Sequence, residues 1–325
     1  MWGASIVVLL ALLVADFIIT RKPHTVSMRE AVWWSVFYLA LPFIFTLGLW
    51  PAFGAGVSLD FLTGFVVEKS LSVDNLFVFM LILTGFAVPE EMRQRVLLFG
   101  VVGAIILRAV FIAMGAAMLQ AGTWAFLVFG LILLASAVKI LHGAITGADQ
   151  QRDVSKLRSV RLLRRVVPVT ADFRGTRMWA SENGHWAITP LAVVVFAVFA
   201  TDIVFAVDSV PAVYGITADP YLVFTTNAFA LLGLRALYFV LQSLLAKLRH
   251  LNYGLAVILA FIGVKLALHW AHSVWPAVPT IPTPVSLALI VVALAVVTVT
   301  SFVARHREER ATVGSKSCLR QYSNS

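Results

Sequence analysis

The stretch Glu68–Phe79, EKSLSVDNLFVF, interrupts a segment, 59–88, that is otherwise apolar enough to cross a bilayer. It contains four charged or amide side chains at membrane depth: Glu68, Lys69, Asp74 and Asn75. A charged side chain at the bilayer centre costs roughly 3 kcal/mol or more, so such residues usually face a partner or a watery cavity and mark a site. The stretch therefore predicts a functional site inside a membrane-spanning helix.

The same pattern returns at Asp202–Pro211, DIVFAVDSVP. In both copies an acid is followed six residues later by a second acid, and then by Asn or Ser. Each copy is followed by Leu-Arg-Ala on the next apolar segment and Val-Lys on the one after, which adds four basic residues: Arg108, Lys139, Arg235 and Lys265. Each unit holds three spans, an odd number, so the second unit enters the membrane from the opposite side. The pattern predicts an inverted three-helix repeat, 59–145 and 188–272, of the kind found in secondary transporters.

Composition agrees with a membrane protein, because 60% of the 325 residues are hydrophobic and 13% are charged. At about 20 residues per crossing, we expect an all-α polytopic fold with about nine spans. These are 3–20, 30–50, 59–88, 95–119, 123–145, 187–214, 219–246, 251–272 and 283–304. The single cysteine, Cys318, allows neither a disulfide framework nor a cysteine metal cage.

Lysine and arginine occur in alternate connections between the spans, and all nine tryptophans fall at or near span ends. The positive-inside rule then places the amino terminus outside and the carboxyl terminus in the cytoplasm. The net charge of +9 is thus a topology signal, and we expect no nucleic-acid partner. The expected organisation has six parts: two N-terminal helices in 1–58, repeat units 59–145 and 188–272, a basic cytoplasmic loop 146–187, a ninth helix in 273–304 and a basic tail 305–325.

The acids of the two motifs are the candidate metal ligands: Glu68, Asp74, Asp202 and Asp208. Nearby polar residues are candidate supporting ligands: Ser70, Ser72, Asn75, Ser209 and Asn227. Such oxygen donors suit Mg²⁺, Ca²⁺ or Mn²⁺, and buried carboxylates can also carry protons. Six residues of regular helix turn a side chain by about 240° and advance it about 9 Å. Either the helices break at the motifs, or the two acids of each motif serve different ions.

Other interpretations of the same residues remain open. The bases Lys69, Arg108, Lys139, Arg235 and Lys265 could pair with the acids only to join helices, or they could neutralise an ion site. Two aspartates on neighbouring helices could also activate water in an intramembrane hydrolase, although the Gly-x-Gly-Asp expected there is absent. A scaffold or chaperone for membrane proteins, acting through the basic loop, is a third possibility. We expect a transporter without enzyme activity, catalytic residues or a permanently bound cofactor.

The chain resembles the TerC family of integral membrane proteins, and within it the Alx-like branch of bacterial manganese exporters. The resemblance covers most of the chain and is carried by RKPHTVSMREAVWWS (21–35), EKSLSVDNLFVF (68–79), RVLLFGVVGAIILRAVFI (95–112), TPL (189–191), TDIVFAVDSVPAVYGIT (201–217), FTTNAFALLGLRALYF (224–239) and GLAVILAFIGVK (254–265).

This resemblance implies a multi-pass protein of the bacterial inner membrane that exports Mn²⁺, with the four motif acids as functional residues. Its partners would be the lipid bilayer, the divalent ion and exchanged protons; the sequence specifies no oligomeric state. Many relatives carry a further acid three residues before the first aspartate of the second motif, where this chain has Phe199. That difference bears on the number of ligands.

Overall fold

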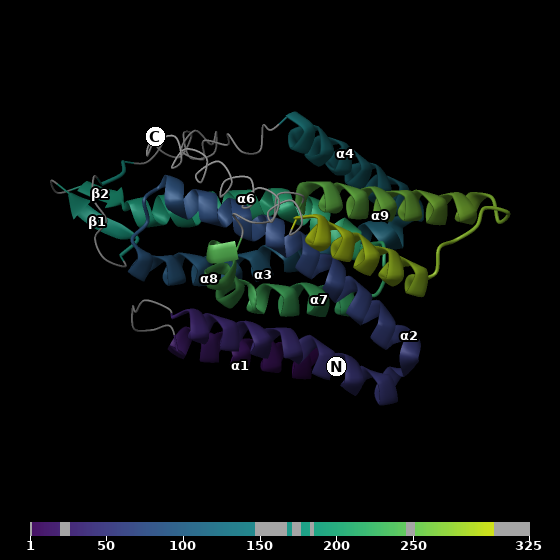
Figure 1. The fold of residues 1–325 in the computed structure, drawn as a ribbon, viewed down its shortest axis with the longest axis horizontal. Helices are drawn as coiled ribbons and strands as arrows, with labels where there is room; N and C mark the ends of the chain where they lie inside the picture. Colours follow the sequence, from purple (N-terminus) through teal and green to yellow (C-terminus); the bar gives the residue numbers. More distant parts are fainter. Residues whose placement is uncertain are drawn as a thin grey trace, which may run out of the picture.

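The computed structural model describes residues 2–19, 27–146, 168–170, 177–182, 185–244 and 251–301. The described chain is mostly helical, with one small antiparallel hairpin (Figure 1). Its elements are α1 (Trp2–Ile19), α2 (Met28–Gly85), α3 (Glu90–Ala121), α4 (Trp124–Thr146), β1 (Trp179–Glu182), β2 (His185–Ile188), α6 (Pro190–Tyr214), α7 (Pro220–Leu232), α8 (Leu234–Leu244), α9 (Leu251–Val274) and a last helix, Thr283–Ser301.

Six of the described helices are long and apolar enough to cross a membrane. They are α2, α3, α4, α6, α9 and Thr283–Ser301. The predicted class, an all-helical multi-pass membrane protein, agrees with this arrangement. The number of crossings and their orientation stay predictions.

Helix α2 spans 58 residues and contains two of the predicted spans, 30–50 and 59–88. It is bent at Gly54, whose φ of 86° lies in the left-handed region that favours glycine. Phe43 and Phe65 would lie about 33 Å apart along a straight helix, yet their ring centroids are 6.3 Å apart. The chain therefore reverses at Gly54, and Figure 1 shows the two halves of α2 running in opposite directions.

The predicted span 219–246 is not one continuous helix, because the structure divides it into α7 and α8 at Gly233. At 1.5 Å per residue, α7 with its 13 residues is about 20 Å long, and α8 with 11 residues is shorter. Neither crosses the ~30 Å hydrocarbon core alone. The Lys69 ammonium donates to the Ala230 carbonyl at 3.1 Å, in the last turn of α7. This carbonyl is one of the four that a helix end leaves without a partner in the helix.

The strands β1 and β2 pair antiparallel, from Trp179 opposite Ile188 to Glu182 opposite His185. This hairpin lies at one end of the helical bundle, and the bend of α2 lies at the other (Figure 1). The hairpin was not predicted, because all of its residues except Ile188 belong to the predicted basic loop 146–187. Most of that loop, and the basic tail, lie outside the described residues.

Helices α4 and α9 approach closely through two glycines. A Cβ added at Gly130 would lie 2.8 Å from the Gly263 carbonyl oxygen, and one added at Gly263 would lie 3.0 Å from the Gly130 carbonyl oxygen. Small residues that let backbones touch are typical of membrane helix interfaces. These two helices are the third members of the two predicted repeat units.

Candidate functional site

Both acid motifs lie in continuous α-helix. Within α2 the only residue with non-helical φ and ψ is Gly54, and α6 runs from Pro190 to Tyr214 through its whole motif. The possibility that the helices break at the motifs is therefore wrong. The other possibility remains: the two acids of each motif point in different directions and have different surroundings.

The first acids of the two motifs meet at one arginine. Glu68 of α2 and Asp202 of α6 are 0% and 1% exposed, and the Arg108 side chain of α3 lies between them, 1% exposed. Arg108 Nη1 donates to Glu68 Oε1 in a short hydrogen bond. Arg108 Nη2 is 3.5 Å from Asp202 Oδ1, which is longer than the 2.7–2.9 Å typical of a charge-assisted hydrogen bond. The arginine thus pairs closely with Glu68 and loosely with Asp202.

Two amides complete this buried cluster. Arg108 Nη1 also donates to Asn227 Oδ1 of α7 at 2.8 Å, and Asn227 Nδ2 donates to the Val223 carbonyl. Hydrogen bonding assigns the Asn75 amide so that its oxygen accepts from Arg108 Nη2 at 3.2 Å and its nitrogen donates to the Leu71 carbonyl. Asn75 and Asn227, both predicted as supporting residues, therefore contact the arginine. We call Glu68, Asn75, Arg108, Asp202 and Asn227 the arginine cluster.

The described charges of the arginine cluster do not balance. Two carboxylates and one guanidinium leave a formal charge of −1 when all three groups are ionised. Glu68 Oε2 and both Asp202 oxygens have no hydrogen-bond partner within the described part of the chain. An uncompensated buried charge is strongly unfavourable. The cluster is thus suited to hold an additional cation or a proton near Asp202.

A seven-residue spacing explains which motif residues share a helix face with the first acid of each motif. Seven residues of α-helix turn a side chain by about 700°, close to two full turns. Asn75 therefore lies on the same face as Glu68, and Ser209 lies on the same face as Asp202. Both Asn75 and Ser209 are buried. The sequence alone indicated this shared face, because a polar residue follows the second acid of each motif, Asn75 in one and Ser209 in the other.

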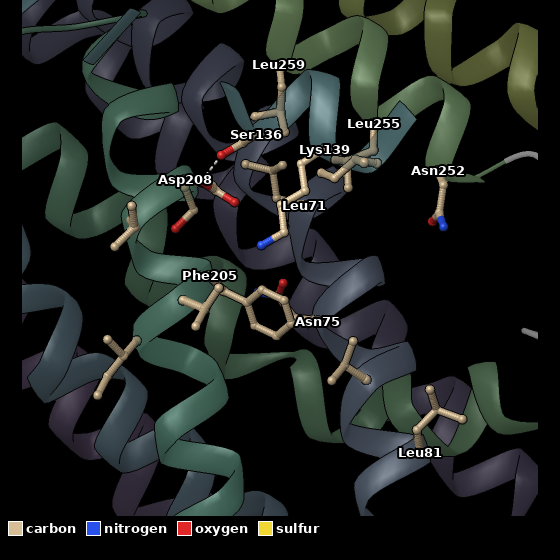
Figure 2. Close-up of a pocket in the computed structure, with 16 residues that line it drawn as sticks. Leu71, Asn75, Leu81, Ser136, Lys139, Phe205, Asp208, Asn252, Leu255 and Leu259 are labelled. Carbon is tan, nitrogen blue, oxygen red and sulfur yellow. Dashed lines mark hydrogen bonds between the residues drawn. The ribbon is translucent and has the colours of Figure 1, made fainter. Parts of the chain in front are cut away.

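The second acid of the α6 motif lies in a different place. Asp208 lines a cavity of 340 Å³ between α2, α4, α6 and α9. Its Oδ1 accepts a hydrogen bond from Ser136 Oγ of α4, and Figure 2 shows this pair with Lys139 beside it. The polar residues that line the cavity are Asn75, Ser136, Lys139, Asp208, Ser209 and Asn252; the remaining lining residues are apolar. Ser136 and the cavity itself were not anticipated from the sequence.

The other predicted residues have varied surroundings. Ser70 and Ser72 donate to carbonyls of their own helix, those of Val66 and Glu68, respectively. The Lys265 ammonium of α9 and the Asp60 carboxylate of α2 attract each other, because their charges are opposite. The side chains of Asp74 and Arg235 lie outside the described part of the structure.

Phe199 packs against α3. A Cβ added at Gly103 would lie 1.5 Å from its ring, so the ring occupies space that only a glycine leaves open. An apolar ring at this position contributes no ligand atom.

A single site with all four acids stays a prediction. Among the described residues, no group of three or more His, Cys, Asp or Glu side chains is close enough to hold a metal ion. The structure instead divides the described acids: Glu68 and Asp202 lie at Arg108, and Asp208 lies at the cavity.

Comparison with known proteins places the chain in a family. The model of the integral membrane protein TerC family matches residues 54–309. A protein of Photorhabdus laumondii named "Putative membrane-bound redox modulator Alx" is 39% identical over 276 residues, covering 82% of this chain and 85% of its own. The Escherichia coli O157:H7 protein of the same name is 35% identical over 325 residues, covering 97% of this chain and 98% of its own. An uncharacterized membrane protein of Myxococcus xanthus is 39% identical over 269 residues, covering 82% and 83%. No solved structure is significantly similar. The chain therefore belongs to the TerC family of integral membrane proteins.

Proposed function

We propose that this protein is a secondary transporter that exports a divalent cation, with Mn²⁺ as the expected substrate, from the cytoplasm of a bacterium across the inner membrane in exchange for protons. The observation that carries the proposal is the arginine cluster. It is buried where α2, α3, α6 and α7 meet, and its described charges sum to −1. An intramembrane acid without full compensation is typical of ion and proton pathways.

The helix arrangement supports the proposed nine crossings with an inverted repeat. Nine crossings result when the two halves of α2 count separately and α7–α8 counts as one broken crossing. The others are α1, α3, α4, α6, α9 and Thr283–Ser301. The second half of α2, α3 and α4 would form the first unit, and α6, α7–α8 and α9 the second. Discontinuous helices are typical of transporters with such repeats, and Lys69 beside the end of α7 stabilises the break.

The competing functions fit the described residues less well. An aspartyl hydrolase needs two carboxylates that share one water molecule, whereas a guanidinium lies between Glu68 and Asp202. Two relatives are named as redox modulators. A thiol–disulfide cycle within one chain would need a second cysteine beside Cys318.

The test is Mn²⁺ flux into or out of proteoliposomes across an imposed pH gradient, with Mg²⁺, Ca²⁺ and Fe²⁺ as competitors. We expect Asp208→Asn and Asp202→Asn to abolish flux while the amount of folded protein is unchanged. Glu90→Gln is the matched control, because Glu90 has an exposed side chain at the start of α3. Flux of the two aspartate variants at the wild-type rate would contradict the proposal.

A second variant separates transport from a scaffold role. Deleting most of the basic loop between α4 and β1 should leave flux intact if the helices alone carry the ion. Loss of a membrane partner with flux retained would indicate an additional scaffold function. Absence of flux for every metal in the wild-type protein would contradict the transporter proposal itself.

A further inference from the structure

We propose that the β1–β2 hairpin is a lipid-binding site that holds two tryptophans, Trp179 and Trp186, in the headgroup layer of the cytoplasmic leaflet, beside anionic phospholipids. The hairpin lies at the end of the bundle where α6 begins (Figure 1). This site is distinct from the acid motifs and does not depend on ion transport. Its cytoplasmic position follows from the predicted orientation, in which the basic loop before α6 faces the cytoplasm.

The two tryptophans lie on one face of the hairpin. Trp179 is paired with Ile188, and Trp186 stands two residues before Ile188 on the other strand. Paired residues share a face of the sheet and side chains alternate along a strand, so the two indoles are diagonal neighbours. Trp179 is 64% exposed, and Trp186, at 78%, is the most exposed large hydrophobic side chain in the described part of the chain. The other face carries Ala180 and Ala187, which are buried.

This pair of indoles indicates a binding surface. Both precede Pro190, where the spanning helix α6 begins. Large apolar side chains that protrude together from a segment outside the hydrocarbon core mark contact with a membrane or a partner. Tryptophan is enriched at the headgroup layer, because its ring is apolar and its N–H group can donate a hydrogen bond. The residue type therefore favours lipid headgroups.

The length of the chain places both indoles near the headgroup layer. The 25 residues of α6 make it about 37 Å long, which exceeds the ~30 Å hydrocarbon core, so the ends of α6 reach the headgroups. Trp186 is four residues before Pro190, at most about 14 Å of chain. Trp179 is level with Ile188, which is two residues before Pro190. Both indoles can therefore reach the headgroups that surround the start of α6.

Charge favours anionic headgroups over neutral ones. The basic loop 146–187, which contains most of the hairpin, carries eight lysines or arginines against four aspartates or glutamates. Arg177, two residues before Trp179, is exposed. Anionic lipids of the cytoplasmic leaflet attract basic residues next to a membrane span. The surface thus combines indoles suited to the headgroup layer with positive charge suited to lipid phosphates.

The hairpin is fixed to the first turn of α6. Thr189, the single residue between β2 and α6, donates its hydroxyl to the Arg177 carbonyl at 2.7 Å and its amide to the Met178 carbonyl at 2.9 Å. The same hydroxyl accepts from the Ala192 amide as the N-cap of α6. A hairpin held in the headgroup layer therefore fixes the depth at which α6, with its acid motif, enters the membrane.

The experiment is fluorine NMR of the full-length protein, labelled with fluorotryptophan, in lipid nanodiscs of phosphatidylglycerol or of phosphatidylcholine. Trp179→Phe and Trp186→Phe variants assign the two signals. A lipid with a nitroxide on its headgroup broadens the signals of indoles in the headgroup layer, and a water-soluble gadolinium chelate broadens those exposed to water. We expect the lipid nitroxide to broaden both signals in phosphatidylglycerol. The chelate should broaden them at least about threefold less there than in phosphatidylcholine.

Trp275 is the matched control within the same protein. Its indole is 59% exposed just after α9, and the connection 275–282 contains no charged residue. Its signal should respond equally in the two lipids. Arg177→Gln should bring the two lipids closer together for Trp179 and Trp186, because one basic residue near an anionic leaflet shifts such an equilibrium by roughly fivefold.

Three results would overturn the proposal. Full broadening of both hairpin signals by the chelate in either lipid would mean that the indoles face water. Protection from the chelate without broadening by the lipid nitroxide would mean that protein covers them instead. Equal protection in the two lipids would remove the role of anionic headgroups. The flux test of the transporter is decided separately from all three.

Discussion

The acid motifs of α2 and α6 differ at the residue that follows the first acid: Lys69 in α2 and Ile203 in α6. Lys69 crosses to α7 and donates to a carbonyl in its last turn, next to the break at Gly233. Ile203 is apolar and lines the cavity. The helix that the predicted repeat pairs with α7–α8 is α3, and it is continuous from Glu90 to Ala121. The two similar motifs thus have different surroundings, because one has a lysine at this position and the other an isoleucine.

This difference shows that two similar sequence motifs can have unequal surroundings. The first motif supplies Lys69, which reaches the broken helix, and two residues, Glu68 and Asn75, that accept hydrogen bonds from Arg108. The second motif supplies a loosely paired acid, Asp202, and a second acid that lines a cavity.

The largest expected effect comes from removing the charge that both motifs share. Arg108→Met leaves two buried carboxylates without a partner and should destabilise the protein by about 3–5 kcal/mol. Thermal unfolding of the purified protein measures this. Adding Glu68→Gln should recover part of the loss, because it removes one of the two charges. Wild-type stability in the single variant would show that the carboxylates do not depend on the arginine.

An intermediate effect is expected where the motifs differ. Lys69→Met removes the donor to the Ala230 carbonyl and should cost about 1–3 kcal/mol. Ile203→Met, a change of similar size at the matching position, should cost less than about 1.5 kcal/mol. Hydrogen exchange of the amides in α7 and α8 would locate the effect. Equal losses from both substitutions would contradict the role of Lys69 at the helix break.

The smallest effect is expected from a hydroxyl of the second motif. Ser209→Ala removes a buried hydroxyl without a hydrogen-bond partner among the described residues, so it should cause no loss of stability, because no hydrogen bond is broken. Ser72→Ala, which removes a buried hydroxyl that donates to the Glu68 carbonyl, should cost about 1 kcal/mol. Thermal unfolding of the two variants side by side makes the comparison. A larger loss for Ser209→Ala would mean that its hydroxyl is already bonded within the protein.

Much of the fold followed from composition and spacing. The apolar runs predicted helices at 30–50 and 59–88, and the structure contains both within α2, on either side of the bend at Gly54. The break at Gly233 was missed because the residues around it, Phe229 to Leu234, are as apolar as a continuous span. A glycine in an apolar helix is compatible with either outcome, and what stabilises the break here is a lysine 164 positions earlier in the chain.

The sequence by itself determined that this is a helical membrane protein of the TerC family with two acid motifs inside apolar segments. Hydropathy and a repeated sequence pattern can both be recognised without knowing how the helices pack. It also determined that the two acids of a regular motif face different ways, since six residues turn a helix by about 240°. Only the tertiary structure decided that Glu68 and Asp202 meet at Arg108, that Asp208 joins Ser136 at a cavity, and that Lys69 lies at the end of α7. These contacts join residues 40 to 161 positions apart, and no local pattern specifies which helix faces come together.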